Sequence, residues 1–211
     1  MLLRIEICLI ALVVAVLCPA VAEAEEKTVS LFDGDSTGAW KSIEFGGEGE
    51  VHVSFEGELT LENGNPITGV VWTGDAIPKT NYEISLEAKK YYGDDFFCGL
   101  TFPVGDSHAT LICGGWGGAI LGLSSIDGKD ASLNETRMLT SLEDGRWYLL
   151  RVRVTDTAIS GWFDEELVFE VQREGKEISL RPGPIEKCVP LGIANYRTRS
   201  AFRKIELKQL D

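Results

Sequence analysis

Several signatures of common enzyme classes are absent from this sequence. It has no glycine-rich phosphate loop leading into a helix, no GxSxG nucleophile elbow between a strand and a helix, and no HExxH motif; Gly34 to Gly38 matches the GxSxG string, but no helical pattern follows it. These motifs supply, respectively, a phosphate cradle, an exposed nucleophilic serine and a zinc site with its base. Nucleotide hydrolysis, serine-esterase chemistry and zinc proteolysis therefore have no support in the sequence.

Cysteine and histidine are scarce. The 211 residues include five cysteines and two histidines, and no cysteines follow the CxxC spacing of zinc fingers or thioredoxin-like sites. Cys8 and Cys18 lie in the amino-terminal segment, so Cys98, Cys113 and Cys188 remain in the body of the chain. If a disulfide forms, we expect it between Cys98 and Cys113, which lie on the two arms of one predicted hairpin. The alternative is that all three are small, buried apolar residues.

Positive charge is also in short supply. Lysine and arginine number 20 against 33 aspartates and glutamates, which gives a formal net charge of −13. An acidic surface repels phosphate backbones and anionic lipids. We therefore expect no nucleic-acid partner, whereas neutral ligands such as carbohydrates, and cations, remain compatible with this charge.

One long hydrophobic run is present, at the amino terminus. Ile7 to Leu17 is almost wholly apolar, follows Arg4 and precedes Ala20-Val21-Ala22, which fits a small-x-small cleavage site. This order predicts a secretory signal peptide over residues 1–22. The run is shorter than the ~18 residues that would argue for a transmembrane helix, so we predict a secreted protein with no membrane span.

After the predicted signal peptide, the hydrophobic pattern is that of strands. Tyr82 to Lys89 and Tyr148 to Val154 alternate apolar with polar residues, as do shorter stretches at 51–55 and 167–171. Glycine- and proline-rich turns separate these stretches, and Ala131 to Ser141 is the single, weak candidate for a helical turn. Many short strands with such turns predict one all-β sandwich or barrel domain over residues 23–211.

The stretch from Gly93 to Gly118 predicts a β-hairpin that ends in an unusual tryptophan. Gly105-Asp106-Ser107-His108 separates two apolar runs, and Trp116 stands among four glycines, at 114, 115, 117 and 118. Glycines on both sides leave the indole uncovered, so it can present a flat face on which a sugar ring docks. The alternative is a core tryptophan whose glycines form a bulge.

Both ends of the predicted domain resemble a known family. Val29 to Gly34 reads VSLFDG and precedes Gly38-Ala39-Trp40, while Leu191 to Thr198 reads LGIANYRT and precedes the strand Ala201 to Leu207. This opener and closing strand pair, with Asp144 to Tyr148 between them, resemble the 3-keto-disaccharide hydrolase domain family. The resemblance implies a concanavalin-like β-jelly-roll of two antiparallel sheets in the secreted or periplasmic space of a bacterial cell envelope. It also implies hydrolysis of glycosides oxidised at C3 of the sugar, with a divalent metal such as Ca²⁺ as candidate cofactor.

One stretch departs from the family pattern. Many members carry Asn-Ser-Gly where this chain reads Phe97-Cys98-Gly99, followed by a strand with Glu and Gln where this chain has Thr110 to Cys113. Polar positions of that motif are thus apolar here. The departure leaves two alternatives, a site that has moved or a site that has been lost.

Cleavage of a 3-keto-glycoside needs a base, a stabiliser of the ketone oxygen and an acid for the leaving group. We predict His108 or Glu135 as the base, and Arg137 or a metal held by Asp127 and Asp130 as the stabiliser. Asp106 is a candidate partner for His108 and for the substrate. The structural alternatives are a solvated histidine, a turn aspartate that caps its own backbone, and a Glu135–Arg137 ion pair.

The segment from Asp127 to Glu135 is the richest in hard oxygen ligands. Asp127 and Asp130 are predicted to hold a Ca²⁺-like ion, with Asn134 as a substrate ligand. Its spacing matches no EF-hand, and a solvated acidic loop is the alternative. We expect the site where the hairpin turn, Trp116 and this loop converge on the concave sheet face. The protein is then a glycoside hydrolase or lyase acting on 3-keto-glycosides, or a non-catalytic glycan-binding or cell-envelope interaction module.

Overall fold

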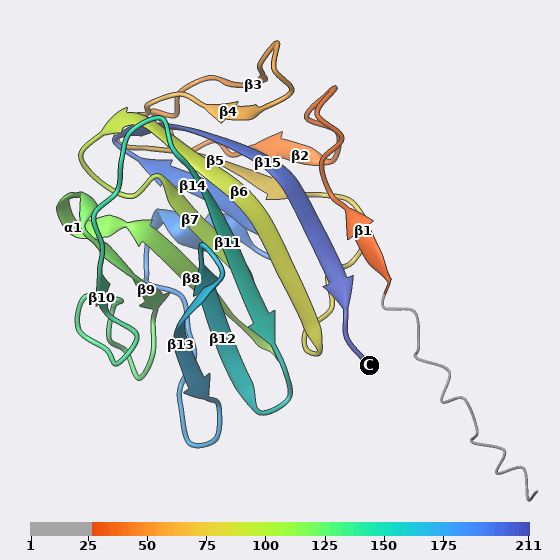
Figure 1. The fold of residues 1–211 in the computed structure, drawn as a ribbon, viewed down its shortest axis with the longest axis vertical. Coiled ribbons are helices and arrows are strands. Elements are labelled where there is room, and N and C mark those ends of the chain that lie inside the picture. The colour runs from red at the N-terminus through yellow and green to blue at the C-terminus, as the bar shows by residue number, and fades with distance from the viewer. Residues whose placement is uncertain (1–26) are drawn as a thin grey trace, which may run out of the picture.

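Residues 27–211, which the computed structural model describes, form two antiparallel β-sheets packed face to face (Figure 1). The predicted signal peptide lies outside these residues. One sheet has eight strands, in the order β13 (Glu166–Gln172), β12 (Ala158–Phe163), β11 (Trp147–Val154), β6 (Tyr82–Gly93), β15 (Thr198–Gln209), β4 (Leu59–Leu61) and β3 (Val51–Val53), with β1 (Thr28–Ser30) paired to β15.

The second sheet carries seven strands. Their order is β10 (Met138–Leu139), β9 (Ile120–Ser124), β8 (Ser107–Gly114), β7 (Cys98–Val104), β14 (Gly192–Tyr196), β5 (Ile67–Trp72) and β2 (Trp40–Ser42). Two short helical segments interrupt the strands, α1 (Gly115–Gly118) and the 3₁₀ helix η1 (Pro184–Cys188). This two-sheet jelly-roll confirms the predicted fold class.

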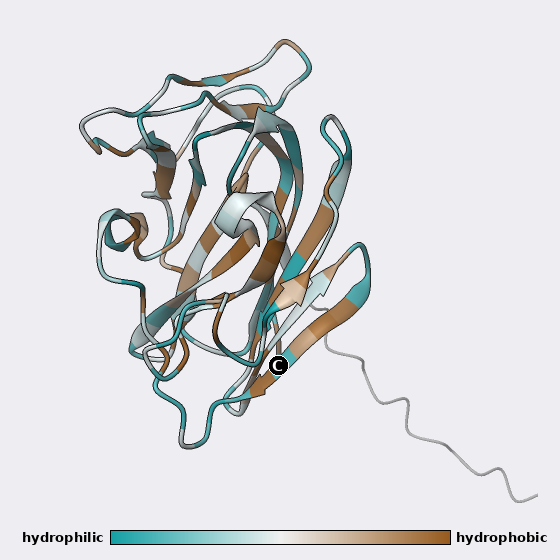
Figure 2. Ribbon diagram, turned by 90° about the vertical axis from the view of Figure 1, so that its left-hand side faces the viewer, coloured by the Kyte–Doolittle hydropathy of each residue, from teal (hydrophilic) through white to brown (hydrophobic). Residues whose placement is uncertain are grey.

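The core lies between the sheets because the strands alternate as the sequence predicts. In β6, Tyr82, Ile84, Leu86 and Ala88 are fully buried in it. β11 pairs with β6 in register and contributes its own alternate residues, beginning with Tyr148. Apolar stretches run along the strands in Figure 2. No helix within residues 27–211 is long and apolar enough to cross a membrane.

Two details of the predicted pattern are wrong. Phe55 does not continue strand β3, which ends at Val53, but lies fully exposed in the following turn. Leu167 is half exposed because the register of β12 and β13 shifts beside it, and Val168 packs against the core instead. In both cases the sequence continues to alternate apolar and polar residues, but the strand pairing that would bury the apolar ones has ended or shifted.

The candidate helical turn in the stretch 131–141 is absent. Residues 131–136 form successive turns, and residues 138–139 form the short edge strand β10. Asn134 contributes to this conformation because its side-chain oxygen accepts the backbone N–H of Thr136 at 2.9 Å, a donor that a helix would pair with the carbonyl of residue 132.

The three cysteines of the described chain are buried free thiols. Cys98 of β7 lies directly opposite Cys113 of β8, as the hairpin prediction requires. Burial raises the pKa of all three thiols, that of Cys188 to about 12. The structure therefore has the small, buried apolar cysteines of the alternative interpretation rather than a Cys98–Cys113 bridge.

Candidate functional site

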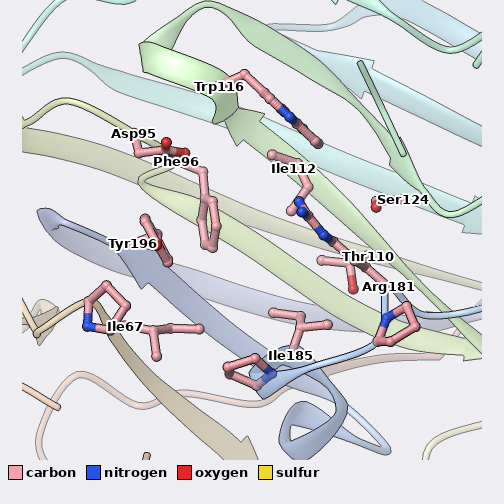
Figure 3. A pocket seen from close by; sticks show the side chains of 13 residues that line it. Ile67, Asp95, Phe96, Thr110, Ile112, Trp116, Ser124, Arg181, Ile185 and Tyr196 are labelled. Carbon is pink, nitrogen blue, oxygen red and sulfur yellow. Dashed lines mark hydrogen bonds between the residues drawn. The ribbon is translucent and has the colours of Figure 1, made fainter. Parts of the chain in front are cut away.

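A pocket of about 450 Å³ opens on the outer face of the seven-stranded sheet (Figure 3). Its floor follows from the alternation of β8: Leu111 and Cys113 point into the core, so Thr110 and Ile112 face the pocket. Trp116, immediately after this strand, also lines it, and we call the hollow the Trp116 pocket. Its volume lies within the range of about 300–1,000 Å³ that is usual for small-molecule sites.

One side of the Trp116 pocket is apolar and aromatic. The rings of Phe96 and Tyr196 lie 5.7 Å apart at 32°. Ile67 and Ile185 extend the same side, and all four residues belong to a second hydrophobic cluster outside the main core. This cluster remains open toward the pocket, which gives the site a preformed apolar wall.

Trp116 is held over the pocket by an unusual backbone conformation. Its φ and ψ are 52° and 55°, in the left-handed region, and Gly114 before it and Gly117 after it also have positive φ, at 81° and 84°. Glycine adopts this region freely, whereas a bulky residue there costs about 1–3 kcal/mol, and such strain concentrates at functional sites. The turn leaves Trp116 39% exposed, so the flat side chain is available to a ligand.

Arg181 supplies the positive charge of the pocket. Its guanidinium lies 5.9 Å from the centroid of the Trp116 ring, within cation–π range. Asp130 approaches the guanidinium at 3.6 Å and also accepts a 3.2 Å hydrogen bond from Ser124 Oγ. Figure 3 shows the arginine reaching past Thr110 toward Ile112, beneath the indole. Asp130 thus helps to orient the Arg181 guanidinium, which reaches the pocket.

Asp95 is the one carboxylate among the residues that line the Trp116 pocket. One of its oxygens accepts the backbone N–H of Phe96 at 2.8 Å. Figure 3 places it beside Phe96, away from Ser124. The pocket therefore carries one acidic and one basic side chain, at separate places on its wall.

The edges of the pocket are set by segments that rest directly on the sheet. A side chain at Gly192 of β14 would place its Cβ 2.5 Å from the carbonyl oxygen of Cys188 in η1, and one at Gly122 of β9 would lie 2.9 Å from the carbonyl oxygen of Thr136. Both strands need glycine there because backbone covers them. η1 and the 129–137 loop thus bound the part of the outer face on which the pocket lies.

The residues predicted as base and partner in the hairpin do not line the pocket. His108 is half-buried and shares the outer face with Thr110, but it lies nearer the start of β8. Its burial, and to a smaller extent the charge of Lys79, lower its pKa. Asp106 is exposed and forms a 2.8 Å ion pair with Lys79. The predicted partnership of Asp106 with His108 is thus replaced by an ion pair at the hairpin turn.

The predicted acid–base and ketone-binding residues of the 127–137 segment also lie away from the pocket. Glu135 pairs with Lys176 at 2.7 Å, and this hydrogen bond holds the pKa of the carboxyl below its usual value. Asp127 approaches the same lysine at 3.3 Å. Arg137 is exposed and is not the partner of Glu135. The segment is a surface ion-pair network around Lys176.

The predicted metal and substrate ligands of the same segment have structural partners. Asp127 faces Lys176 whereas Asp130 faces Ser124 and Arg181, so the two carboxylates are divided between different cations. Within residues 27–211, no group of three or more His, Cys, Asp or Glu side chains is arranged to hold a metal ion. Asn134 is buried, and its side-chain amide makes four hydrogen bonds within the loop, which leaves it no capacity for substrate.

Among the residues that line the pocket, Trp116 alone is predicted from the sequence. Arg181 lies in an Arg-Pro-Gly-Pro stretch that indicates only a turn. Asp95 and Phe96 follow a glycine at a turn, and Tyr196 lies in a motif that fits a strand. Long-range packing brings them together: the backbone N–H of Tyr196 donates to the carbonyl of Phe96 at 2.9 Å. No local spacing in the sequence encodes that contact.

The two-sheet fold and the family match place the protein among the jelly-roll sandwiches of the carbohydrate-active, glycosidase-like and carbohydrate-binding class. Residues 27–208 match the family described as the 3-keto-alpha-glucoside-1,2-lyase-like domain, and the chain belongs to this family. The expected resemblance is thereby confirmed over nearly all of the described chain.

Solved structures share the fold at low sequence identity. The carbohydrate-binding module CBM66 from Bacillus subtilis is similar with a TM-score of 0.53 at 11% identity, over 80% of this chain and 94% of that one. A β-glucanase from Bacillus licheniformis gives a TM-score of 0.53 at 11% identity, over 88% of this chain and 98% of its own. A search of curated proteins gave no significant match.

Proposed function

We propose that this protein binds a glycoside in the Trp116 pocket, with the sugar ring stacked on the indole. The observation that carries the proposal is Trp116 itself, a bulky residue in a strained left-handed turn, exposed above a preformed pocket. Sugars present C–H groups on their flat faces, and burial of such a face against an aromatic ring contributes to affinity. Arg181 beside the ring is positioned to donate hydrogen bonds to sugar oxygens.

We further propose that the bound glycoside is oxidised at C3 and is cleaved by 1,2-elimination. A ketone at C3 acidifies the hydrogen on C2. A base removes this proton, the electron pair forms the C1=C2 double bond, and the C1–O bond breaks so that the leaving oxygen takes up a proton. Asp95 is the candidate base because it is the carboxylate that lines the pocket. Arg181 is the candidate partner of the enolate oxygen. Support for this reaction comes from the family to which residues 27–208 belong.

A non-catalytic glycan-binding module is the second candidate. Many members of the family carry Glu and Gln on the strand that here reads Thr110 to Cys113, and of these four residues Thr110 and Ile112 face the pocket. A floor without those polar groups still supports stacking on Trp116. It offers fewer groups to move protons, which favours binding without turnover.

We also propose that the protein is exported, to the periplasm or beyond the cell. The support is the order of charged, apolar and small residues over positions 1–22. Intact mass measurement of protein purified from its native host tests this. A mature chain that begins near residue 23 is expected, and a chain that retains Met1 in the soluble cell fraction would contradict export.

The reaction is tested by incubating the protein with 4-nitrophenyl 3-keto-α-glucoside and following release of 4-nitrophenol. Release is expected with the native chain and is expected to fall at least a hundredfold in Asp95→Asn. His108→Ala, a change on the same face outside the pocket, is the matched control and is expected to retain activity. Parallel reactions with EDTA and with added Ca²⁺ show whether a divalent metal takes part.

The alternatives give different results in the same experiment. Binding of the unoxidised glucoside by calorimetry with no release from the 3-keto form supports the binding module. Trp116→Ala is expected to weaken this binding about tenfold, which corresponds to about 1.4 kcal/mol. Neither binding nor release would refute both proposals, and release that survives Asp95→Asn would remove Asp95 from the mechanism.

A further inference from the structure

We infer that the ligand of the Trp116 pocket is amphipathic, a glycoside whose aglycone is an aromatic ring rather than a second sugar. The inference rests on the proposed function, because it takes Trp116 as the sugar-binding end of the pocket. It adds the chemical class of the group on the other side of the glycosidic bond. The pocket itself is divided in a way that matches such a ligand.

Apart from Asp95, which lies beside Phe96, the polar side chains that line the pocket are gathered at one side. Figure 3 shows Arg181, Thr110 and Ser124 together beneath Trp116. Ser124 and Arg181 both contact Asp130, which ties this side to the loop that follows β9. A sugar stacked on the indole would meet the donors and acceptors of this side with its hydroxyl groups.

The other side is mainly carbon surface, with the Asp95 carboxylate beside Phe96. Ile67, Phe96, Ile185 and Tyr196 project there, and Phe96 and Tyr196 hold their rings 5.7 Å apart. These side chains are only partly buried, apart from Ile67, so the cluster has a free apolar face. A flat aromatic group laid on that face would bury apolar area on both partners.

Prolines reinforce the apolar character of the rim. Pro66, Pro182 and Pro184 line the pocket, and proline has no backbone N–H to donate. A second sugar ring in this half would therefore lose water from its hydroxyl groups and find few donors in return. Polar groups buried without partners weaken binding. An aromatic aglycone meets no such penalty, so the two halves of the pocket select opposite ends of one amphipathic glycoside.

Equilibrium binding of phenyl α-glucoside and methyl α-glucoside tests the inference. The two share a sugar and differ in the aglycone, and neither carries the ketone needed for elimination. Calorimetry with the native chain is expected to show at least tenfold tighter binding of the phenyl glucoside. Maltose, with glucose as its aglycone, is expected to bind no better than the methyl glucoside.

Variants separate the two halves of the pocket. Phe96→Ala is expected to reduce the phenyl-to-methyl ratio to about threefold or less, whereas Trp116→Ala is expected to weaken both glucosides by the same factor and preserve the ratio. Ile185→Ser, a change in a half-buried residue of η1, is a second test of the apolar half should Phe96→Ala fail to fold. A thermal melt of each variant identifies a folding defect.

Each outcome bears on a different statement. A phenyl-to-methyl ratio near one, with both glucosides bound and both weakened by Trp116→Ala, would overturn the aromatic aglycone and leave the proposed function intact. Binding of maltose tighter than phenyl glucoside would overturn it as well. Failure of the glucosides and of their 3-keto forms to bind at all would refute the proposed function, and the inference with it.

Discussion

Replacing Trp116 by glycine is expected to yield a more stable protein than replacing it by alanine. Both changes remove the indole, so the comparison isolates the backbone at φ 52° and ψ 55°. A residue with a Cβ atom costs about 1–2 kcal/mol in the left-handed region. Glycine avoids that cost but gains about 0.4–1 kcal/mol of conformational freedom in the unfolded chain. The balance favours glycine by about 1 kcal/mol.

Urea or thermal unfolding of Trp116→Gly and Trp116→Ala measures this difference. For a domain of about 150–250 residues, 1 kcal/mol corresponds to about 2–4 °C in the midpoint temperature. Both variants are expected to lose carbohydrate binding equally, because neither has a ring. The result would show that function, rather than stability, is served by a tryptophan at this position.

Leu139 provides the matched control. It is 63% exposed on the edge strand β10, outside any left-handed turn. Leu139→Gly is expected to be less stable than Leu139→Ala by about 0.5–1 kcal/mol, the usual order for a strand. If glycine at position 116 is also the less stable substitution, the left-handed conformation of Trp116 is wrong, and the argument from strain to ligand binding fails with it.

Three further predictions concern groups outside the pocket. Backbone N–H groups of residues 45–47 hold the pKa of Glu48 at about 2, below the usual 4.5. The stability that this carboxylate contributes is therefore complete above pH 4.5 and is lost as pH falls toward 2. Over that interval the midpoint temperature of Glu48→Gln should fall less than that of the native chain, and parallel profiles would contradict this. Asn134→Ala removes four hydrogen bonds, three of them buried, and is expected to cost about 2–4 kcal/mol in urea unfolding, so a loss below 1 kcal/mol would be evidence against the loop structure. Cys98, Cys113 and Cys188 are expected to react with Ellman's reagent only after denaturation, because burial raises their pKa values; rapid labelling of the native chain would be inconsistent with their positions.

Sequence reasoning reached the fold because local pattern and tertiary pairing agree in this chain. In β6 and β11 the alternate apolar residues are those that the structure buries between the sheets. The hairpin of β7 and β8 has its turn at Gly105-Asp106, as expected. Where pairing ends or shifts, as at Phe55 and Leu167, the pattern alone misleads. Hydrophobic periodicity predicts a strand but contains no information about its bulges.

The residues of the site are harder to predict from the sequence than the fold, for a physical reason. Trp116 was a candidate because its flanking glycines signal an unusual backbone, and it does line a pocket. His108 and Glu135 have the chemistry of a general base, but the charges near them, Lys79 and Lys176, come from distant segments. Arg181 enters the pocket from a loop more than sixty residues beyond Trp116. Contacts between residues so far apart in the sequence depend on the tertiary fold of the whole domain.

The glycines at positions 122 and 192 have a consequence for how the protein would recognise a ligand. Backbone lies on backbone at both positions, so η1 and the 129–137 loop, which bound the pocket, rest on the sheet through contacts that no side-chain rotation can loosen. A preorganised wall loses little conformational entropy when a ligand enters, and affinity is then decided by the complementarity of the groups that line it. Selectivity should accordingly be tunable by exchanging Phe96, Ile112 or Tyr196 on a scaffold whose shape does not change.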